Sequence, residues 1–317
     1  MPVTDVVVVA DGTGKSTSIS NALRAAPDYS TKIYIIYVKK GVYKEYVNIG
    51  KEKSNIMLIG DGIDAMVVSD NRNYVDGWTT QEHYVTVKGQ GFIARDITFE
   101  NTTGLEKQQA VAFMSESDRT ILHRCAFKGY QDTLYARDQR QFYRECKITG
   151  TVDFIFGDGT VLFQACDILA RQALPGDGID ATIVSANCNY VDGRTTYRSG
   201  TFYVKGQGLI VRDITIENTA GPAKQQVVAF MSESDAHGAI QPEGWLPWNK
   251  SDFALDTLYY GEYMNNGPGV KLGGRVKWPD YHVITNPVQA SVFTVAKFID
   301  GDTWLHSTGV KYMGALG

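Results

Sequence analysis

The sequence predicts an all-β solenoid, a single domain (residues 1–317) in which short strands stack as successive coils. Short runs rich in β-branched and aromatic residues follow one another along the chain, and no helical pattern separates them. Glycine is frequent, at 32 residues, while proline is scarce at 9, which suits many tight turns. Three cysteines recur 21 and then 20 residues apart. A repeat of about 20 residues without helices is typical of stacked β-coils.

One helix is expected, near the N-terminus. Ser16 or Ser18 is suited to cap a helix through residues 21–26, and Pro27 would end it. This short helix would cover the first coil. The strand-like runs that follow are residues 33–38, 55–59, 84–87 and 92–99. Because no helices alternate with these runs, a doubly wound sheet is disfavoured.

The cysteine repeat predicts a column of side chains in the interior. Residues 123–127, 144–148 and 164–168 align on Cys125, Cys146 and Cys166. In a stack of coils, matching positions lie about 4.8 Å apart. We expect the cysteines to pack as small apolar side chains, although a disulfide within the column is geometrically permitted.

Composition excludes several classes of protein. The 31 basic and 35 acidic residues give a net charge of −4, which argues against a dedicated nucleic-acid binder. No apolar run approaches the roughly 18 residues of a membrane span. The five histidines show no metal-ligand spacing with the cysteines, so no metal or other cofactor is expected. No secretory signal is visible, and Asn101 and Asn249 each begin a glycosylation acceptor pattern, which matters only in a secreted protein.

A second repeat is much closer in sequence. Residues 60–80 recur at 176–196, and residues 89–118 recur at 206–235. Coils of a solenoid share a pattern rather than this degree of identity. The second block therefore indicates a duplication, a recombination or a faulty gene model, and the sequence does not decide among them.

The cysteine spacing also brings two carboxylates together. Asp132 lies seven residues after Cys125, and Asp153 lies seven after Cys146. Stacked coils would place these carboxylates about 5 Å apart. Because two such groups do not ionise easily together, one is expected to hold a proton. Gln109 and Gln131 are 22 residues apart and can stack beside the pair.

Chemistry alone leaves two reactions open. Carboxylates at about 5 to 5.5 Å serve a retaining glycosidase, and they also serve ester hydrolysis through an aspartyl nucleophile. Amide donors beside the pair favour acyl transfer, because its tetrahedral intermediate carries an oxyanion. Since Asp and Gln are also common in turns, a purely structural role stays open as well.

The motifs around these residues resemble those of plant pectin methylesterases. Residues 129–135 (GYQDTLY) and 150–157 (GTVDFIFG) resemble the two signature motifs of that family. Further similarities extend the resemblance to about residues 5–171 and 241–315. They are residues 8–14 (VVADGTG), 107–112 (KQQAVA), 253–263 (FALDTLYYGEY) and 303–305 (TWL).

The resemblance implies a right-handed parallel β-helix that removes methyl esters from cell-wall homogalacturonan without a metal. It implies that Asp153 is the nucleophile and that Asp132 first protonates methanol and then activates water. Gln131, assisted by Gln109, would form the oxyanion hole. By the same resemblance, the substrate-cleft positions include Gln109 and four further residues: Thr80, Tyr135, Phe156 and Trp245.

The sequence also departs from the family pattern. The family's Leu-Gly-Arg-Pro-Trp segment is missing before residues 242–245 (PEGW), and the duplicated block stands in its place. The lost arginine normally pairs with the nucleophile, so Asp153 is expected to be less reliably charged. Arg194 and Arg198 lie in the replacement without a motif that places them at the site. Gln81 stands where the family usually has an aromatic residue.

Three functional hypotheses follow. The leading one is a pectinesterase, of full or reduced activity, that releases methanol from methylated pectin. The second is a catalytically inactive β-solenoid that binds pectin or a protein partner. A polygalacturonase is disfavoured, because its Asn-Thr-Asp and Gly-His-Gly motifs are absent. The family resemblance further implies a monomer in the extracellular cell wall, with methyl-esterified homogalacturonan and a proteinaceous pectinesterase inhibitor as partners, and neither nucleic acid nor membrane.

Overall fold

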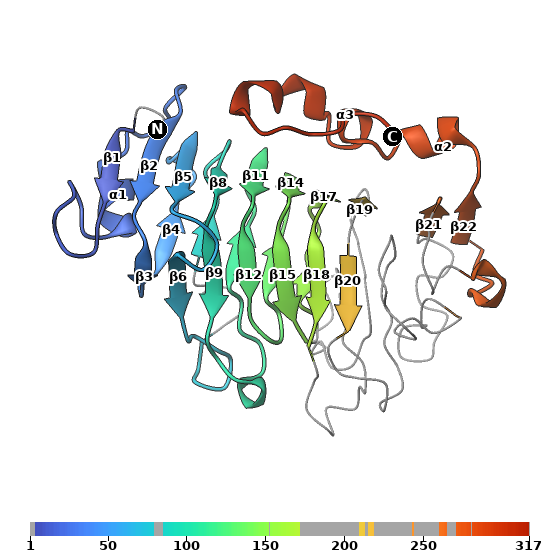
Figure 1. Cartoon of the computed structure of the whole chain (residues 1–317), viewed down its shortest axis with the longest axis horizontal. Coiled ribbons are helices and arrows are strands. Elements are labelled where there is room, and N and C mark those ends of the chain that lie inside the picture. The colour runs from blue at the N-terminus through green and yellow to red at the C-terminus, as the bar shows by residue number, and fades with distance from the viewer. Residues whose placement is uncertain are drawn as a thin grey trace.

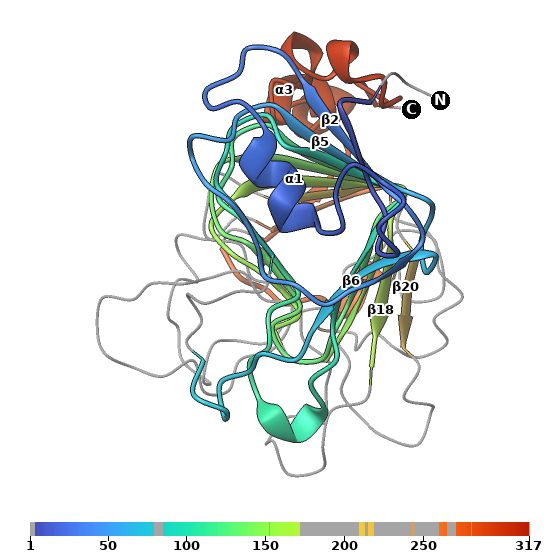
Figure 2. The same ribbon diagram turned by 90° about the vertical axis from the view of Figure 1, so that its left-hand side faces the viewer.

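The chain forms the predicted right-handed parallel β-helix (Figure 1). The computed structural model describes residues 4–78, 85–151, 153–171, 209–212, 215–218, 243, 260–264, 271–279 and 281–316. Three parallel sheets surround a common interior, and each successive coil adds its strands beside those of the coil before it (Figure 2). Within these ranges, no helix is long and apolar enough to cross a membrane.

The strands of the three sheets follow one another in the chain. Sheet 1 contains β1 (Val6–Val8), β2 (Tyr34–Val38), β5 (Ile56–Gly60), β8 (Ile93–Arg95), β11 (Thr120–His123), β14 (Arg140–Arg144), β17 (Thr160–Gln164) and β19 (Leu209–Arg212). Sheet 2 contains β3 (Gly41–Tyr43), β6 (Met66–Asp70), β9 (Thr98–Asn101), β12 (Ala126–Lys128), β15 (Lys147–Gly150), β18 (Asp167–Ala170) and β20 (Thr215–Asn218). Sheet 3 contains β4 (Val47–Ile49), β7 (Val85–Val87), β10 (Phe113–Ser115), β13 (Leu134–Ala136) and β16 (Ile155–Phe156).

The predicted N-terminal helix is present as α1 (Ile19–Ala25). Ser18 is its N-cap, and the Ser18 side chain accepts a hydrogen bond from the amide of Asn21 at 3.1 Å. The helix buries Ile19, Ala22 and Leu23 and lies across the near end of the stack in Figure 2. It therefore shields the apolar interior of the first coil from water.

The predicted strand over residues 92–99 is wrong in one respect, because it is two strands. Asp96 has φ 61° and turns the chain from β8 in sheet 1 to β9 in sheet 2. Arg124, Glu145 and Ala165 have the same left-handed conformation at the equivalent corners of later coils. Non-glycine residues at positive φ are uncommon, so sequence periodicity alone gave no sign of this corner.

The cysteines follow these corners and form the predicted inward column. Cys125, Cys146 and Cys166 are fully buried in the interior cluster, and all three are free thiols. Their packing confirms the apolar-core interpretation over a disulfide. Burial raises the pKa of the Cys146 and Cys166 thiols well above the usual range. All three lie at the corners between a strand of sheet 1 and the next strand of sheet 2.

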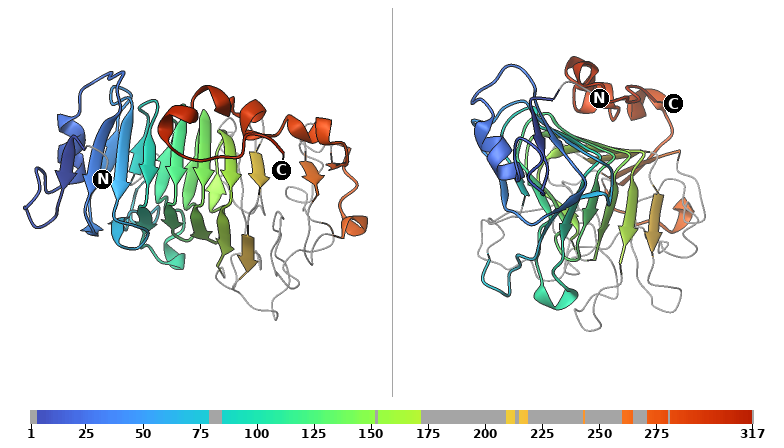
Figure 3. Two further views of the ribbon diagram at one scale, coloured as in Figure 1. Left: turned by 45° about the horizontal axis from the view of Figure 1, so that its top comes forward. Right: turned by 60° about the vertical axis from the view of Figure 1, so that its left-hand side comes forward.

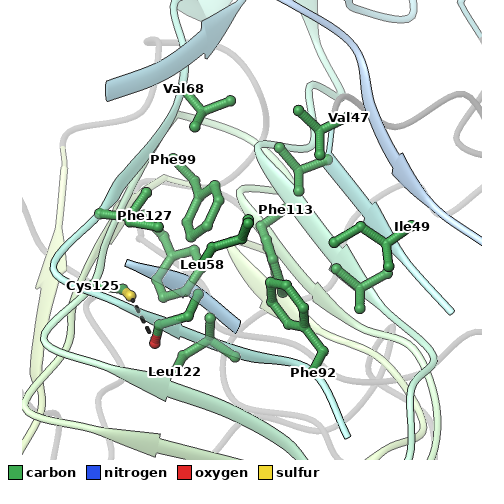
Figure 4. Close-up of a cluster of buried hydrophobic side chains, with 14 of the residues drawn as sticks. Val47, Ile49, Leu58, Val68, Phe92, Phe99, Phe113, Leu122, Cys125 and Phe127 are labelled. Atoms are coloured by element: carbon green, nitrogen blue, oxygen red, sulfur yellow. Dashed lines mark hydrogen bonds between the residues drawn. The ribbon is translucent and has the colours of Figure 1, made fainter. Parts of the chain in front are cut away.

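Aromatic side chains fill much of the interior (Figure 4). The rings of Phe99 and Phe127 stack with centroids 5.6 Å apart, and Phe113 lies 4.9 Å from Phe99 and 5.4 Å from Phe127. Because these residues come from strands of sheets 2 and 3, their contacts hold the sheets together across the interior.

The C-terminal segment covers the outer face of sheet 1 (Figures 1 and 3). It contains α2 (Pro287–Ser291) and α3 (Val295–Phe298), two short helices that the sequence analysis did not predict. Trp304 and Leu305 pack in a second apolar cluster with Phe142 of β14. The side-chain amide of Gln164 also exchanges two hydrogen bonds with the backbone of Met313, at 3.0 and 3.2 Å.

The duplicated block continues the solenoid. Its two described strands, β19 and β20, correspond to residues 92–95 and 98–101 of the first block. β19 pairs with β17 in sheet 1, and β20 pairs with β18 in sheet 2. The copied strands therefore occupy the same two sheets as the strands that they repeat. The rest of the block lies largely outside the described residues.

The acceptor pattern at Asn101 is not available for glycosylation in the folded chain. Asn101 is 3% exposed, and its side-chain nitrogen donates hydrogen bonds to the carbonyl oxygens of Arg72 and Val111, at 2.9 and 3.3 Å. The side chain thus anchors a loop from inside the protein. The second acceptor pattern, at Asn249, lies outside the described residues.

Candidate active site

Asp132 and Asp153 occupy equivalent corners of neighbouring coils, as the spacing predicts. Leu134 pairs with Ile155 and Tyr135 with Phe156, and each aspartate lies two residues before its strand. The amide of Leu134 donates to the carbonyl of Phe154 at 2.9 Å, so the ladder reaches back toward the aspartates. One strand spacing, about 4.8 Å, therefore separates the two backbones.

Both aspartates have left-handed backbones. The φ angle is 62° at Asp132 and 48° at Asp153. Aspartate tolerates this region better than most residues, but the conformation still carries strain. The corner thereby directs two successive coils through the same turn, with a carboxyl group at each.

Burial makes the pair electrostatically unusual. Asp132 is 5% exposed and Asp153 is 8% exposed. Burial, and then the neighbouring charge of Asp153, raise the pKa of Asp132 well above its usual range. Asp132 is therefore suited to hold a proton at a pH at which an ordinary aspartate has lost it.

A β-bulge brings the two glutamines into register. The amides of Ala112 and Phe113 both donate to the carbonyl of Thr133, at 2.9 and 3.3 Å, so the segment that leads into β10 has one extra residue relative to the segment that leads into β13. Before the bulge, the amide of Ala110 donates to the carbonyl of Gln131 at 3.2 Å. Gln109 consequently lies opposite Gln131, 22 residues away. The two backbones are therefore in register, and the stacking of the two side-chain amides beside the carboxyl pair stays a prediction.

Aromatic side chains follow the aspartates on sheet 3. The rings of Tyr135 and Phe156 stack at 4.3 Å with an angle of 12°. Met114 precedes them in the same row, and Val111 completes this small cluster. Val111, Met114 and Phe156 are buried and Tyr135 is half-buried, so the row is a small apolar cluster on the strands that follow the two aspartates.

Comparison with known proteins agrees with this geometry. A family model described as pectinesterase matches residues 5–175, 173–237 and 233–302, and the middle segment coincides with the duplicated block. The chain belongs to the pectinesterase family.

Similar proteins include plant pectinesterases. The "probable pectinesterase/pectinesterase inhibitor 32" of Arabidopsis thaliana is 51% identical over 99% of this chain, and "pectinesterase/pectinesterase inhibitor PPE8B" of Prunus persica is 50% identical over 99%. The chain covers 60% of the length of each. A solved structure of "pectin methylesterase from carrot" matches with a TM-score of 0.83 and 39% identity, covering 100% of this chain and 99% of that one.

Several positions expected from the pectinesterase family lie outside the described residues. They are the substrate-cleft residues Thr80 and Trp245, the departure at Gln81, and the two arginines Arg194 and Arg198. Their placement therefore stays a prediction. The other six predicted site residues lie on neighbouring coils of the described part of the chain: Gln109, Gln131, Asp132, Tyr135, Asp153 and Phe156.

Two neighbours of the carboxyl pair were not among the residues predicted from the sequence. Met114 pairs with Tyr135 in the strand register, and the 21-residue spacing that aligns the aspartates would have found it. Arg171 follows β18, its amide donates to the carbonyl of Gly150 at 2.7 Å, and its guanidinium lies 5.1 Å from the ring centre of Tyr130. Since Tyr130 precedes Gln131, Arg171 brings a positive charge close to the site.

Proposed function

We propose that the protein hydrolyses the methyl esters of homogalacturonan and releases methanol. The observation that carries this proposal is the pair of buried carboxyl groups on adjacent coils, with the pKa of Asp132 raised by burial and by Asp153. Membership of the pectinesterase family and the names of its plant relatives support the same substrate. The half-buried ring of Tyr135, stacked on buried Phe156, suits the apolar face of a sugar.

In the proposed reaction, the carboxylate of Asp153 attacks the ester carbonyl carbon, and the carbonyl electron pair moves to oxygen. The amides of Gln131 and Gln109 donate hydrogen bonds to that oxyanion. When the intermediate collapses, the bond to the methoxy oxygen breaks, and protonated Asp132 gives its proton to the departing methanol. The products of this half-reaction are methanol and an acyl-enzyme anhydride on Asp153.

The second half-reaction regenerates the enzyme. Asp132, now ionised, takes a proton from water as the water oxygen attacks the acyl carbon. The bond to Asp153 breaks, which frees the galacturonate carboxyl group and leaves Asp153 as a carboxylate. Asp132 has its proton back, so the cycle closes without an external acid or base.

Methanol release from methylated homogalacturonan tests the proposal. Asp153→Asn keeps a residue that tolerates the left-handed backbone, but it removes the nucleophile, so release is expected to fall to background. Asp64→Asn is a matched control, because Asp64 also has a left-handed backbone (φ 66°) and lies on the surface, paired with Lys128. Equal release by wild type and Asp153→Asn would refute the mechanism. Pectin binding by a wild type that releases no methanol would favour the inactive binding protein instead.

We further propose that the protein acts as a monomer in the extracellular cell wall and is open to a proteinaceous inhibitor. The names of the plant relatives pair pectinesterase with pectinesterase inhibitor, which supports such a partner. Light scattering of the purified protein, and methanol release with and without an added plant pectinesterase inhibitor, test these points. A stable dimer, or unchanged release at saturating inhibitor, would contradict them.

A further inference from the structure

A cationic and aromatic cluster lies near one end of sheet 3, away from the carboxyl pair. It consists of Tyr46, Arg72 and Trp78 and is called here the Arg72 cluster. The Arg72 guanidinium carbon lies 4.7 Å from the ring centre of Tyr46 and 4.3 Å from that of Trp78. The two rings remain 40% and 38% exposed, so a dissolved ligand can reach this cluster. The proposed reaction uses none of the three residues.

The cluster belongs to the same edge of the solenoid as the carboxyl pair. Arg72 and Trp78 lie in the loop between β6 and β7, which projects from the lower edge in Figure 1 beside η1 (Leu105–Lys107). In this loop, the amide of Tyr74 donates to the carbonyl of Gln109 at 3.0 Å. The ladder then continues from Ala110 to Gln131. A continuous run of backbone hydrogen bonds therefore joins this loop to the two glutamines.

The distance along this edge is several sugar units. Tyr46 directly precedes β4, and Asp153 lies two residues before β16, with β7, β10 and β13 between these strands in sheet 3. Four strand spacings amount to about 19 Å. A single ester group cannot touch both places, whereas an oligosaccharide lying along the edge can.

The chemistry of the cluster suits an anionic sugar. Asp70 lies 3.1 Å from the Nε atom of Arg72, and no described residue accepts a hydrogen bond from the two terminal nitrogens. A guanidinium with those nitrogens available can bind a carboxylate through two parallel hydrogen bonds. Exposed tryptophan and tyrosine rings beside it offer apolar surface to a pyranose.

The loop that carries Arg72 and Trp78 is fixed by hydrogen bonds to buried side chains. The carbonyl of Arg72 accepts a hydrogen bond from buried Asn101, and Asn73 is buried with two hydrogen bonds to Asp76, at 2.7 and 2.9 Å. Lys107 of η1 also contacts Asp76 at 2.5 Å. Such support reduces the entropy lost when a ligand binds.

We propose that the Arg72 cluster is a remote subsite that binds free galacturonate carboxylates on the same polysaccharide whose ester lies at Asp153. This inference rests on the proposed function, because demethylation produces the anionic units that the cluster would bind. Stretches that already carry free carboxylates would then hold the neighbouring esters at the carboxyl pair. The subsite thereby favours partly demethylated chains over fully methylated ones.

Binding of fully de-esterified oligogalacturonates to the full chain tests the subsite without any need for turnover. Calorimetric titrations use two lengths, one that covers only the carboxyl pair and one that extends past about 19 Å. Wild type is expected to bind the long oligomer more tightly. Arg72→Met should weaken long-oligomer binding about two- to fivefold and Trp78→Ala about two- to tenfold, and neither should change short-oligomer binding. Added salt should shrink the Arg72→Met effect and not the Trp78→Ala effect.

Arg124→Met is the matched control. Arg124 is also paired with an aspartate, Asp96, but it lies at the corner between sheets 1 and 2. Arg124→Met should leave the affinity for both oligomers unchanged. If the ratio of long-oligomer to short-oligomer affinity in Arg72→Met and Trp78→Ala equals that of wild type, the subsite is refuted. This includes the case in which both oligomers lose affinity by the same factor. If wild type releases no methanol yet Arg72→Met removes the length preference, the subsite stands and the proposed activity fails.

Discussion

The raised pKa of Asp132 predicts that Asp132→Asn stabilises the fold near neutral pH while it removes esterase activity. Below about pH 3.9, the aspartate is protonated in the folded and the unfolded chain, and its burial carries no ionisation cost. As the pH rises, the unfolded chain releases this proton and the folded chain keeps it. The free energy of unfolding then falls by about 1.36 kcal/mol per pH unit until the pH reaches the pKa of Asp132 in the folded chain. Above that pH the loss stays constant.

This cost has an upper limit. At pH 7 it is at most about 4 kcal/mol, the value reached if Asp132 stays protonated throughout. Asparagine does not titrate and tolerates the left-handed backbone of this position, so the variant avoids the cost without adding strain. With about 2 to 4 °C per kcal/mol, its Tm should exceed that of wild type by several degrees at about pH 7.

Thermal unfolding of both proteins from about pH 4 to about pH 8 measures the effect. The gain in Tm should grow with pH over this range and nearly vanish at its acidic end. Asp64→Asn is the control of opposite sign, because the hydrogen bond from Lys128 lowers the pKa of Asp64. It should leave the Tm equal or slightly lower at neutral pH. A gain for Asp132→Asn that is independent of pH, or a loss at every pH, would refute the reasoning.

Three further predictions concern the Tyr135 stack, the aromatic interior and buried Asn101. Tyr135→Ala removes the stack with Phe156 and should raise KM for methylated homogalacturonan up to about tenfold in steady-state assays, with kcat nearly unchanged; a fall in kcat alone would contradict this. Phe127→Ala opens a cavity among interior rings and should lower the free energy of unfolding by about 3–5 kcal/mol in denaturant titrations. When wild type and Asn101→Gln are expressed in a glycosylating host, their masses should differ only by the substitution. The Tm of Asn101→Gln should be lower than that of wild type, because two buried hydrogen bonds are lost. Loss of a glycan mass in the variant would show that Asn101 is glycosylated.

The sequence was sufficient for the stacking of the coils because repeated spacings leave a direct trace in it. The intervals between the cysteines and between Asp132 and Asp153 correspond to one coil, so residues that match in sequence also match in space. The interval between Gln109 and Gln131 is one residue longer. Their alignment depends on the bulge at Ala112, and no residue type in this part of the sequence predicts a bulge.

Sequence periodicity could not predict features that depend on contacts between residues far apart in the chain. The corner at Asp96 adopts a conformation that few non-glycine residues accept, and the coils around it enforce that conformation. The short helices α2 and α3 form where the C-terminal segment packs on sheet 1, and their length is too small for propensity to predict them. The Arg72 cluster likewise joins residues of two loops that have no shared spacing.

The placement of β19 and β20 shows how such an architecture tolerates the replacement of one segment by another. Each coil touches only the coils on its two sides, so a spliced segment needs compatible edges and little else. A segment taken from an earlier part of the same gene product already has those edges, because it was shaped to lie between two similar neighbours. Solenoids can therefore exchange one coil-forming segment for another, whereas a closed barrel would have to rebuild its whole circumference.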